Sequence, residues 1–137
     1  MRILAIDPGE KRIGLALSDP TGSIASPLMV LKHTSRPVDA AAIADLAKQY
    51  QAALIVVGHS LDDDGSSTPQ SRRAIRLVEA IRLQCEIPIK LWDESFSTQE
   101  ARQARIEMST TRRRRRGHLD DLAASVILQS YLDANPQ

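Results

Sequence analysis

The N-terminal segment RILAIDPGEKRIGLALSD, residues 2–19, constrains the fold more than any other part of the chain. Residues 3–6 are a continuous apolar run, as in a central strand that is covered on both faces. Residues 13–18 alternate between apolar and small side chains, which predicts a second strand, and the short Pro-Gly linker predicts a hairpin. Asp7 ends the first strand, where a carboxylate is costly to bury unless it is paired or bound to a ligand.

The rest of the chain alternates apolar runs with segments of helical periodicity. We predict further strands at residues 24–31, 54–57 and 87–92, and helices at residues 37–51, 70–84, 98–108 and from near His118 onward. Pro27 predicts an edge or bulged third strand, and Gly58 is expected to end the fourth. On the helix at 70–84 we expect Ile75, Val78, Ile81 and Cys85 to share one apolar face.

Strands separated by helices imply parallel neighbours, whereas the initial meander implies antiparallel pairs. We therefore predict an α/β fold, a mixed five-stranded sheet with helices on both faces. The length of 137 residues fits one domain over residues 1–137.

The composition is that of an ordinary soluble globular protein, with 42% hydrophobic residues, 26% charged residues and a formal net charge of +1. Cys85 is the single cysteine, which excludes an internal disulfide and suits a reducing compartment. No apolar run approaches the ~20 residues of a membrane span. We expect a cytoplasmic protein.

Acidic residues lie at the ends of three predicted elements: Asp7, Glu94 beside Asp93, and the pair Asp120 and Asp121 in the first turn of the last helix. Functional groups gather at the carboxyl ends of strands in sheets of this kind, and Asp7 and Glu94 meet there if one strand separates theirs. A carboxylate cluster binds hard cations such as Mg²⁺, and paired metals support phosphodiester hydrolysis. The structural alternative for the helix aspartates is capping and interaction with the helix dipole.

Basic residues are concentrated in two places. The larger group is an unbroken run of five, Arg112, Arg113, Arg114, Arg115 and Arg116, which favours contact with a phosphate backbone over a merely solvated loop. In the first turn, Lys11 and Arg12 hold phosphate or neutralise Asp7, and the alternative is an ordinary surface turn. Gly9 suits a positive φ or a close backbone approach. No motif for reading base sequence is present.

Four segments together resemble the successive motifs of the YqgF/RuvX nuclease family: IDPGEKRIGLALSD, VVG followed by DDDG, LWDESFSTQEA and LDDLAASVILQSYL. The resemblance implies a ribonuclease H-like fold and one of two activities, trimming the 5′ end of pre-16S ribosomal RNA or resolving Holliday junctions. The implied ligands of the metal, Mg²⁺ or Mn²⁺, are Asp7, Glu94 and Asp120. The other matching positions are Gly9, Lys11 and Thr98.

The chain departs from the family pattern at three places, one of which is that the basic loop before Asp120 is unusually pure in arginine. The family usually has a proline and an asparagine in the loop after VVG, whereas this chain has His59, Ser60, Leu61 and Asp62. Ser95 stands where the family commonly has an arginine, and we hypothesise that the arginine run compensates for it.

The leading hypothesis is a metal-dependent nuclease that processes pre-16S ribosomal RNA as a monomer or homodimer, with a Holliday junction resolvase as the alternative. Two other classes stay open. The segment DPGEKRIG also fits the phosphate loop of sugar kinases and actin-like ATPases, although these need two such domains. A non-catalytic RNA-binding module would use the arginines and not the carboxylates.

Overall fold

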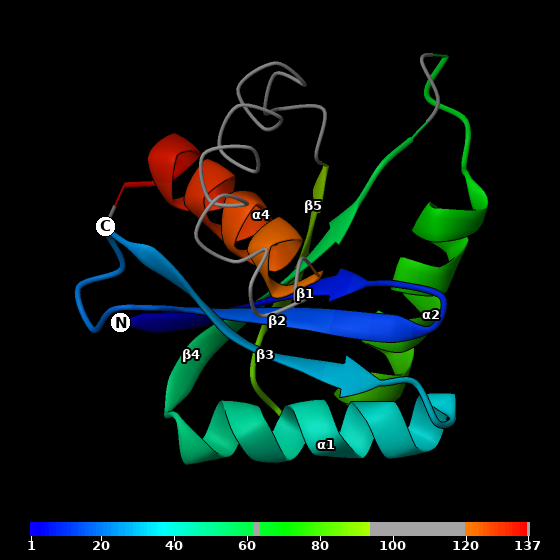
Figure 1. Ribbon diagram of the computed structural model, residues 1–137, viewed down its shortest axis with the longest axis horizontal. Helices are drawn as coiled ribbons and strands as arrows, with labels where there is room; N and C mark the ends of the chain where they lie inside the picture. Colours follow the sequence, from blue (N-terminus) through cyan, green and yellow to red (C-terminus); the bar gives the residue numbers. More distant parts are fainter. Residues whose placement is uncertain (62–63, 94–119, 137) are drawn as a thin grey trace, which may run out of the picture.

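The computed structural model describes residues 1–61, 64–93 and 120–136, without the side chains of Asp120 and Asp121 (Figure 1). The described elements are β1 (Arg2–Pro8), β2 (Arg12–Ser18), β3 (Ala25–Lys32), α1 (Arg36–Gln49), β4 (Ala52–His59), α2 (Pro69–Arg82), β5 (Ile89–Asp93) and α4 (Asp120–Ala134). The helix predicted at 98–108 lies outside the described residues. None of the described helices is both long and apolar enough to cross a membrane.

The five strands form one mixed sheet, as predicted. Their order is β3-β2-β1-β4-β5. The pairs β1–β2 and β2–β3 are antiparallel, whereas β1–β4 and β4–β5 are parallel. The strands β1 and β5 therefore run in the same direction with only β4 between them.

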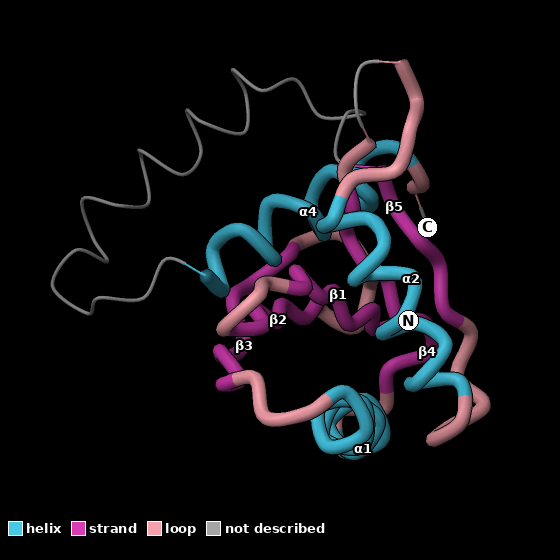
Figure 2. The backbone as a smooth tube through the Cα atoms, turned by 90° about the vertical axis from the view of Figure 1, so that its right-hand side faces the viewer, coloured by secondary structure: helices cyan, strands magenta, loops and turns pink. Residues whose placement is uncertain are grey.

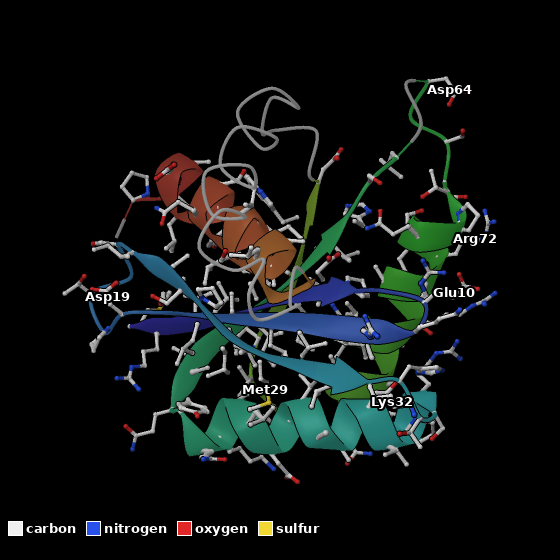
Figure 3. The ribbon with its side chains drawn as sticks, in the orientation of Figure 1. Glu10, Asp19, Met29, Lys32, Asp64 and Arg72 are labelled. Carbon is white, nitrogen blue, oxygen red and sulfur yellow. The ribbon has the colours of Figure 1, made fainter. Side chains whose placement is uncertain are left out.

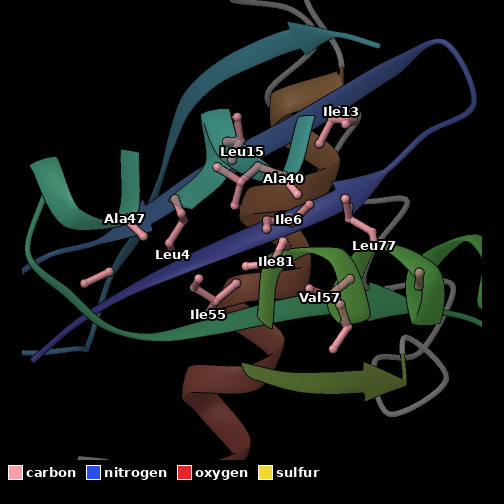
Figure 4. Close-up of a cluster of buried hydrophobic side chains, with 14 residues drawn as sticks. Leu4, Ile6, Ile13, Leu15, Ala40, Ala47, Ile55, Val57, Leu77 and Ile81 are labelled. Atoms are coloured by element: carbon pink, nitrogen blue, oxygen red, sulfur yellow. The ribbon is translucent and has the colours of Figure 1, made fainter. Parts of the chain in front are cut away.

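Helices cover both faces of the sheet, and α1 and α4 lie on opposite sides of the strands (Figure 2). On the α1/α2 face, the buried residues are Leu4, Ile6, Ile13, Leu15, Ala40, Ile43, Ala47, Ala52, Ile55, Val57, Ala74, Leu77, Val78 and Ile81 (Figure 4). On the α4 face, they are Ile3, Ala5, Ala16, Leu54, Val56, Ala124, Leu128, Tyr131 and Leu132. The run at residues 3–6 is apolar throughout because its side chains alternate between these two clusters.

Proline and capping residues shape β3 and the start of α1, and the edge position predicted from Pro27 is confirmed. Pro27 lies in β3, an edge strand, and the register of β2 against β3 shifts between Leu15 and Ala16, the partner of Pro27. The side chain of Ser35 caps α1 and accepts a hydrogen bond from the Val38 amide at 3.3 Å. Pro37 occupies the first turn of that helix.

The prediction of the buried face of α2 is wrong for Ile75, which is 40% exposed. The buried stripe runs through Ala74, Leu77, Val78 and Ile81, at the spacing i, i+3, i+4 and i+7. Ile75 lies next to this stripe because one residue rotates the helix by about 100°.

The prediction that Gly58 ends the fourth strand is also wrong, since β4 continues to His59 and Gly58 pairs with Trp92 of β5. A Cβ at Gly58 would lie 2.6 Å from Cδ1 of Ile127 in α4. The glycine is therefore needed for the close approach of α4 to the sheet, and not for a turn.

Candidate active site

The carboxyl ends of β1, β4 and β5 lie side by side at one edge of the sheet. The register aligns Ile6 with Val57, and Val57 with Leu91. Asp7 lies one residue beyond this row in β1, and Asp93 lies two residues beyond it in β5. Asp7 and the end of β5 therefore lie at the same edge of the sheet, as the prediction of two parallel strands separated by one strand requires.

Asp7 projects to the α4 face and is half-buried. Ile3 and Ala5 belong to the α4-face cluster, whereas Leu4 and Ile6 belong to the opposite one. Alternation along the strand therefore places Asp7 with Ile3 and Ala5. Asp7 is the next-to-last residue of β1, which ends at Pro8, so the strand is one residue longer than predicted.

The end of β5 is fixed against α4 by Trp92. Its indole Nε1 donates a hydrogen bond to Oγ of Ser130 at 3.2 Å. Its ring meets the ring of Tyr131 edge-on, with centroids 5.2 Å apart. Asp93, the last residue of the strand and the partner of His59, lies on the other face.

The helix α4 carries Asp120 as its first residue. It packs against the sheet through Ile127 at Gly58, and its N-terminal end lies above β2 in both ribbon and tube views (Figures 1 and 2). Leu122, Val126 and Ile127 are buried, as the apolar spacing predicts. The Asp120 side chain lies outside the described residues.

The predicted cations Lys11 and Arg12 lie at the turn that joins the end of β1, just after Asp7, to β2. The Gly9 amide donates to the Asp7 carbonyl at 3.0 Å, and a Cβ at Gly9 would lie 2.1 Å from the carbonyl oxygen of Arg12. Close backbone approach, and not a positive φ, is therefore what requires glycine here. Lys11 and Arg12 are exposed at this turn.

The loop after β4 is organised by its own polar groups. Ser60 donates its amide to Oε1 of Gln70 at 2.9 Å, and Asp64 accepts hydrogen bonds from the hydroxyl and amide of Ser66. These bonds hold the pKa of Asp64 below its usual range. His59 projects to the α1/α2 face, away from Asp7, and its Nδ1 is buried without a hydrogen-bond partner within the described residues.

The three-carboxylate metal cluster stays a prediction. Within residues 1–61, 64–93 and 122–136, no group of three His, Cys, Asp or Glu side chains is placed to hold a metal ion. Only Asp7 of the three predicted ligands is described with its side chain. The positions that fall outside the described residues are Glu94, Thr98, Arg112, Arg113, Arg114, Arg115 and Arg116.

A cavity of about 90 Å³ lies on the α1/α2 side of the same turn. Its polar lining comes from Glu10, His33, Arg36, Asp39 and Arg73. These residues come from separate elements and share no motif, so the sequence does not mark them as site residues. One signal is the position of Arg36 at the start of α1, where the helix dipole disfavours a cation.

Comparison with known sequences identifies the family. The chain matches the RuvX family, described as Holliday junction resolvase, over residues 1–134. It belongs to this family. It is 42% identical over 137 residues to a relative from Syntrophus aciditrophicus, covering 100% of this chain and 91% of the relative. It is 39% identical over 135 residues to a relative from Thermoanaerobacter pseudethanolicus, covering 98% and 97% of the two chains. Both relatives carry pre-16S rRNA nuclease as a provisional name.

Solved structures share the fold at low sequence identity. Thermus thermophilus RuvC in complex with a Holliday junction substrate matches with a TM-score of 0.63 and 15% identity, covering 98% of this chain and 96% of that one. The fowlpox virus Holliday junction resolvase matches with a TM-score of 0.60 and 16% identity, covering 98% and 99%. The predicted ribonuclease H-like fold is confirmed.

Proposed function

We propose that this protein is a metal-dependent nuclease that hydrolyses phosphodiester bonds at the 5′ end of pre-16S ribosomal RNA. Membership of the RuvX family supports a hydrolase acting on nucleic acid. The observation that carries the proposal is the half-buried Asp7 at the carboxyl edge of the sheet, on the face covered by α4. The names of the relatives from Syntrophus and Thermoanaerobacter favour the RNA substrate.

The donor set suits a hard divalent cation. Asp7 supplies a carboxylate at the α4 face, Glu94 follows Asp93 at the end of β5, and Asp120 opens α4. All three are oxygen ligands, which suit Mg²⁺ or Mn²⁺ better than softer metals. Such a metal, when bound, polarises the phosphodiester and lowers the pKa of bound water.

The cations of the chain bind and orient the substrate. Lys11 and Arg12 are exposed and lie four and five residues after Asp7 in the chain. They can therefore hold phosphates beside the scissile bond. Arg112 to Arg116 would add further contacts to the backbone. Fixing the substrate in this way supplies catalysis by positioning, because the reacting phosphate is held at the carboxylates.

Substitution of Asp7 by asparagine tests the function. Loss of a group that only hydrogen-bonds to a metal ligand lowers activity by up to about 100-fold. Asp7→Asn changes a proposed ligand itself, so we expect it to reduce metal-dependent cleavage by at least ~100-fold. The matched control is Asp45→Asn, an exposed aspartate on α1 at the opposite face, which should keep full activity. Circular dichroism checks that both variants are folded. Full cleavage by Asp7→Asn would reject the mechanism.

Resolution of Holliday junctions is the second candidate function, and the family description and the RuvC complex favour it. Parallel assays on a precursor rRNA fragment and a four-way DNA junction, each with metal and with chelator, separate the two. Preferential cleavage of the junction would replace the RNA proposal. A non-catalytic binding module predicts binding to either substrate without cleavage of any. We place the activity in the cytoplasm, where precursor rRNA would be available, in a monomer or a homodimer.

A further inference from the structure

The cavity at the β1–β2 turn is built from three separated parts of the chain. Its wall includes Pro8 from the end of β1, His33 and Arg36 around the start of α1, and Arg73 from α2. Its volume of about 90 Å³ holds several water molecules, and thus a group of the size of a phosphate. Pro8 directly follows Asp7, so the cavity begins next to the proposed catalytic edge.

Arg73 is held in place with most of its guanidinium unused. The side chain is half-buried, and Nε donates to the Pro8 carbonyl at 3.4 Å. The other N–H donors of this guanidinium have no hydrogen-bond or ion-pair partner within the described parts of the chain. A guanidinium fixed at one nitrogen presents the remaining donors in the planar arrangement that binds phosphate oxygens in pairs.

Arg36 faces the same cavity from the N-terminal end of α1 and is exposed. Within the described residues it makes no hydrogen bond or ion pair, so no polar contact ties its guanidinium to the fold. A cation at this end of a helix opposes the helix dipole. An anion bound between Arg36 and Arg73 would remove that unfavourable interaction.

Within the described residues, the carboxylate of Asp39 is held by hydrogen bonds and forms no ion pair with either arginine. Asp39 is 4% exposed and accepts hydrogen bonds from the Thr34 amide at 3.1 Å and from Nδ1 of His33. It therefore orients the His33 ring at the cavity. Glu10 is the other acidic residue of the wall, and it is exposed.

The surface around the cavity is basic. The Lys11 carbonyl accepts the His33 amide at 2.9 Å, so the turn that carries Lys11 lies beside the cavity wall. Arg72 and Arg76 lie exposed one turn apart on α2. Lys32 and Arg72 lie on the same side of the molecule, with Glu10 between them (Figure 3).

We propose that the Arg36/Arg73 pocket binds a backbone phosphate of the nucleic acid, flanking the phosphate held at Asp7. The inference rests on the proposed function, since it assigns this pocket to the same substrate. Phosphodiester is the ligand class that fits, because the pocket offers two guanidiniums, of which Arg73 is held by the Pro8 carbonyl, beside further exposed arginines on α2. The pocket supplies affinity and register along the backbone, and it does not touch the reacting phosphate.

Binding measured without metal tests the pocket independently of cleavage. We would follow the anisotropy of a labelled precursor rRNA fragment in chelator across a salt series, for the wild type, Arg36→Ala, Arg73→Ala and the double variant. Each lost phosphate contact makes the slope of log K against log salt less negative by about 0.7–0.9, so the double variant, which loses the one phosphate of the pocket, should change it by about that amount. The control is Arg82→Ala, an exposed arginine at the other end of α2, which should keep the wild-type slope.

Two further variants separate charge from folding. Arg73→Lys keeps the positive charge but lacks the planar set of guanidinium donors. Its affinity for the RNA should lie between those of the wild type and Arg73→Ala. Glu10→Gln removes a negative charge from the wall and should tighten binding. In cleavage assays, Arg36→Ala should raise KM and leave kcat unchanged, as expected for uniform binding.

If the double variant keeps the wild-type slope of log K against log salt, the pocket does not bind phosphate. That result would leave the nuclease proposal unaffected. Conversely, full cleavage by Asp7→Asn together with the expected change of slope would reject the nuclease mechanism and support the pocket. Wild-type protein that binds no nucleic acid in chelator would overturn the inference.

Discussion

The two faces of the sheet are built differently. The buried cluster of the α1/α2 face is entirely aliphatic. The cluster of the α4 face includes Tyr131, which packs on Trp92, and it depends on the glycine at position 58 to let Ile127 approach. Aliphatic packing is tolerant of rearrangement, whereas an indole hydrogen bond and a glycine contact fix one helix orientation. The packing of the α1/α2 face therefore serves stability. The packing of the α4 face serves stability and in addition sets the position of the helix that begins with Asp120.

The largest expected effect is on stability at the α1/α2 face. Ile43 is fully buried in α1, and Ile43→Ala should lower the free energy of unfolding by about 2–5 kcal/mol. Val38→Ala on the same helix is the control, because Val38 is 53% exposed and should change stability by at most about 0.5 kcal/mol. Denaturant titration measures both. Cleavage per folded molecule should not change, and a loss of it would break the distinction between the faces.

A smaller change in stability with a larger change in activity is expected at the α4 face. Gly58→Val places side-chain atoms where Ile127 lies, and should cost about 1–3 kcal/mol. Displacement of α4 should also reduce cleavage per folded molecule. Adding Ile127→Ala creates room, and a double-mutant cycle should show a coupling of about 0.5–3 kcal/mol. If the free-energy changes of Gly58→Val and Ile127→Ala simply add, the two side chains do not clash.

The smallest effect is expected at the turn after β2, which belongs to the other edge of the sheet. Hydrogen bonds from the Thr21 hydroxyl and the amides of Ile24 and Ser23 hold the pKa of Asp19 well below its usual range. Because the folded pKa is lowered, the stabilisation is present above the unfolded pKa of about 3.9 and is lost as pH falls below it. Asp19→Asn should therefore lower Tm slightly at pH 7, and the difference should shrink in acid.

Thermal melts of the wild type and Asp19→Asn between acid and neutral pH measure this difference. Cleavage at neutral pH should be equal for the two proteins. A difference in Tm that stays constant down to acid pH would contradict the role of the Asp19 carboxylate.

Much of the fold follows from the sequence because its signals are local. The apolar run at residues 3–6 predicts a doubly covered strand, and Pro27 predicts an edge strand. The end of β4 is wrongly predicted from Gly58, because that position is a glycine to make room for Ile127, which lies 69 residues later in the chain. Ile75 misleads because apolar spacing does not tell which side of a helix meets its neighbour.

The candidate site is predictable to a smaller extent. The place of Asp7 and the parallel approach of β1 and β5 follow from the order of strands and helices. The Arg36/Arg73 pocket does not, because its two arginines meet only after α1 and α2 have packed on the same face. Neither lies in a segment that resembles a family motif.

The packing of α4 on β1 has a consequence for the timing of folding. Among the described elements, α4 alone covers the apolar side chains of Ile3, Ala5 and Leu54, and it lies more than a hundred residues after β1. During synthesis, these side chains stay open to solvent or chaperones until α4 has left the ribosome, since such long-range contacts form last. The face of the sheet that carries Asp7 is therefore completed only after the segment that forms α4 has been synthesised.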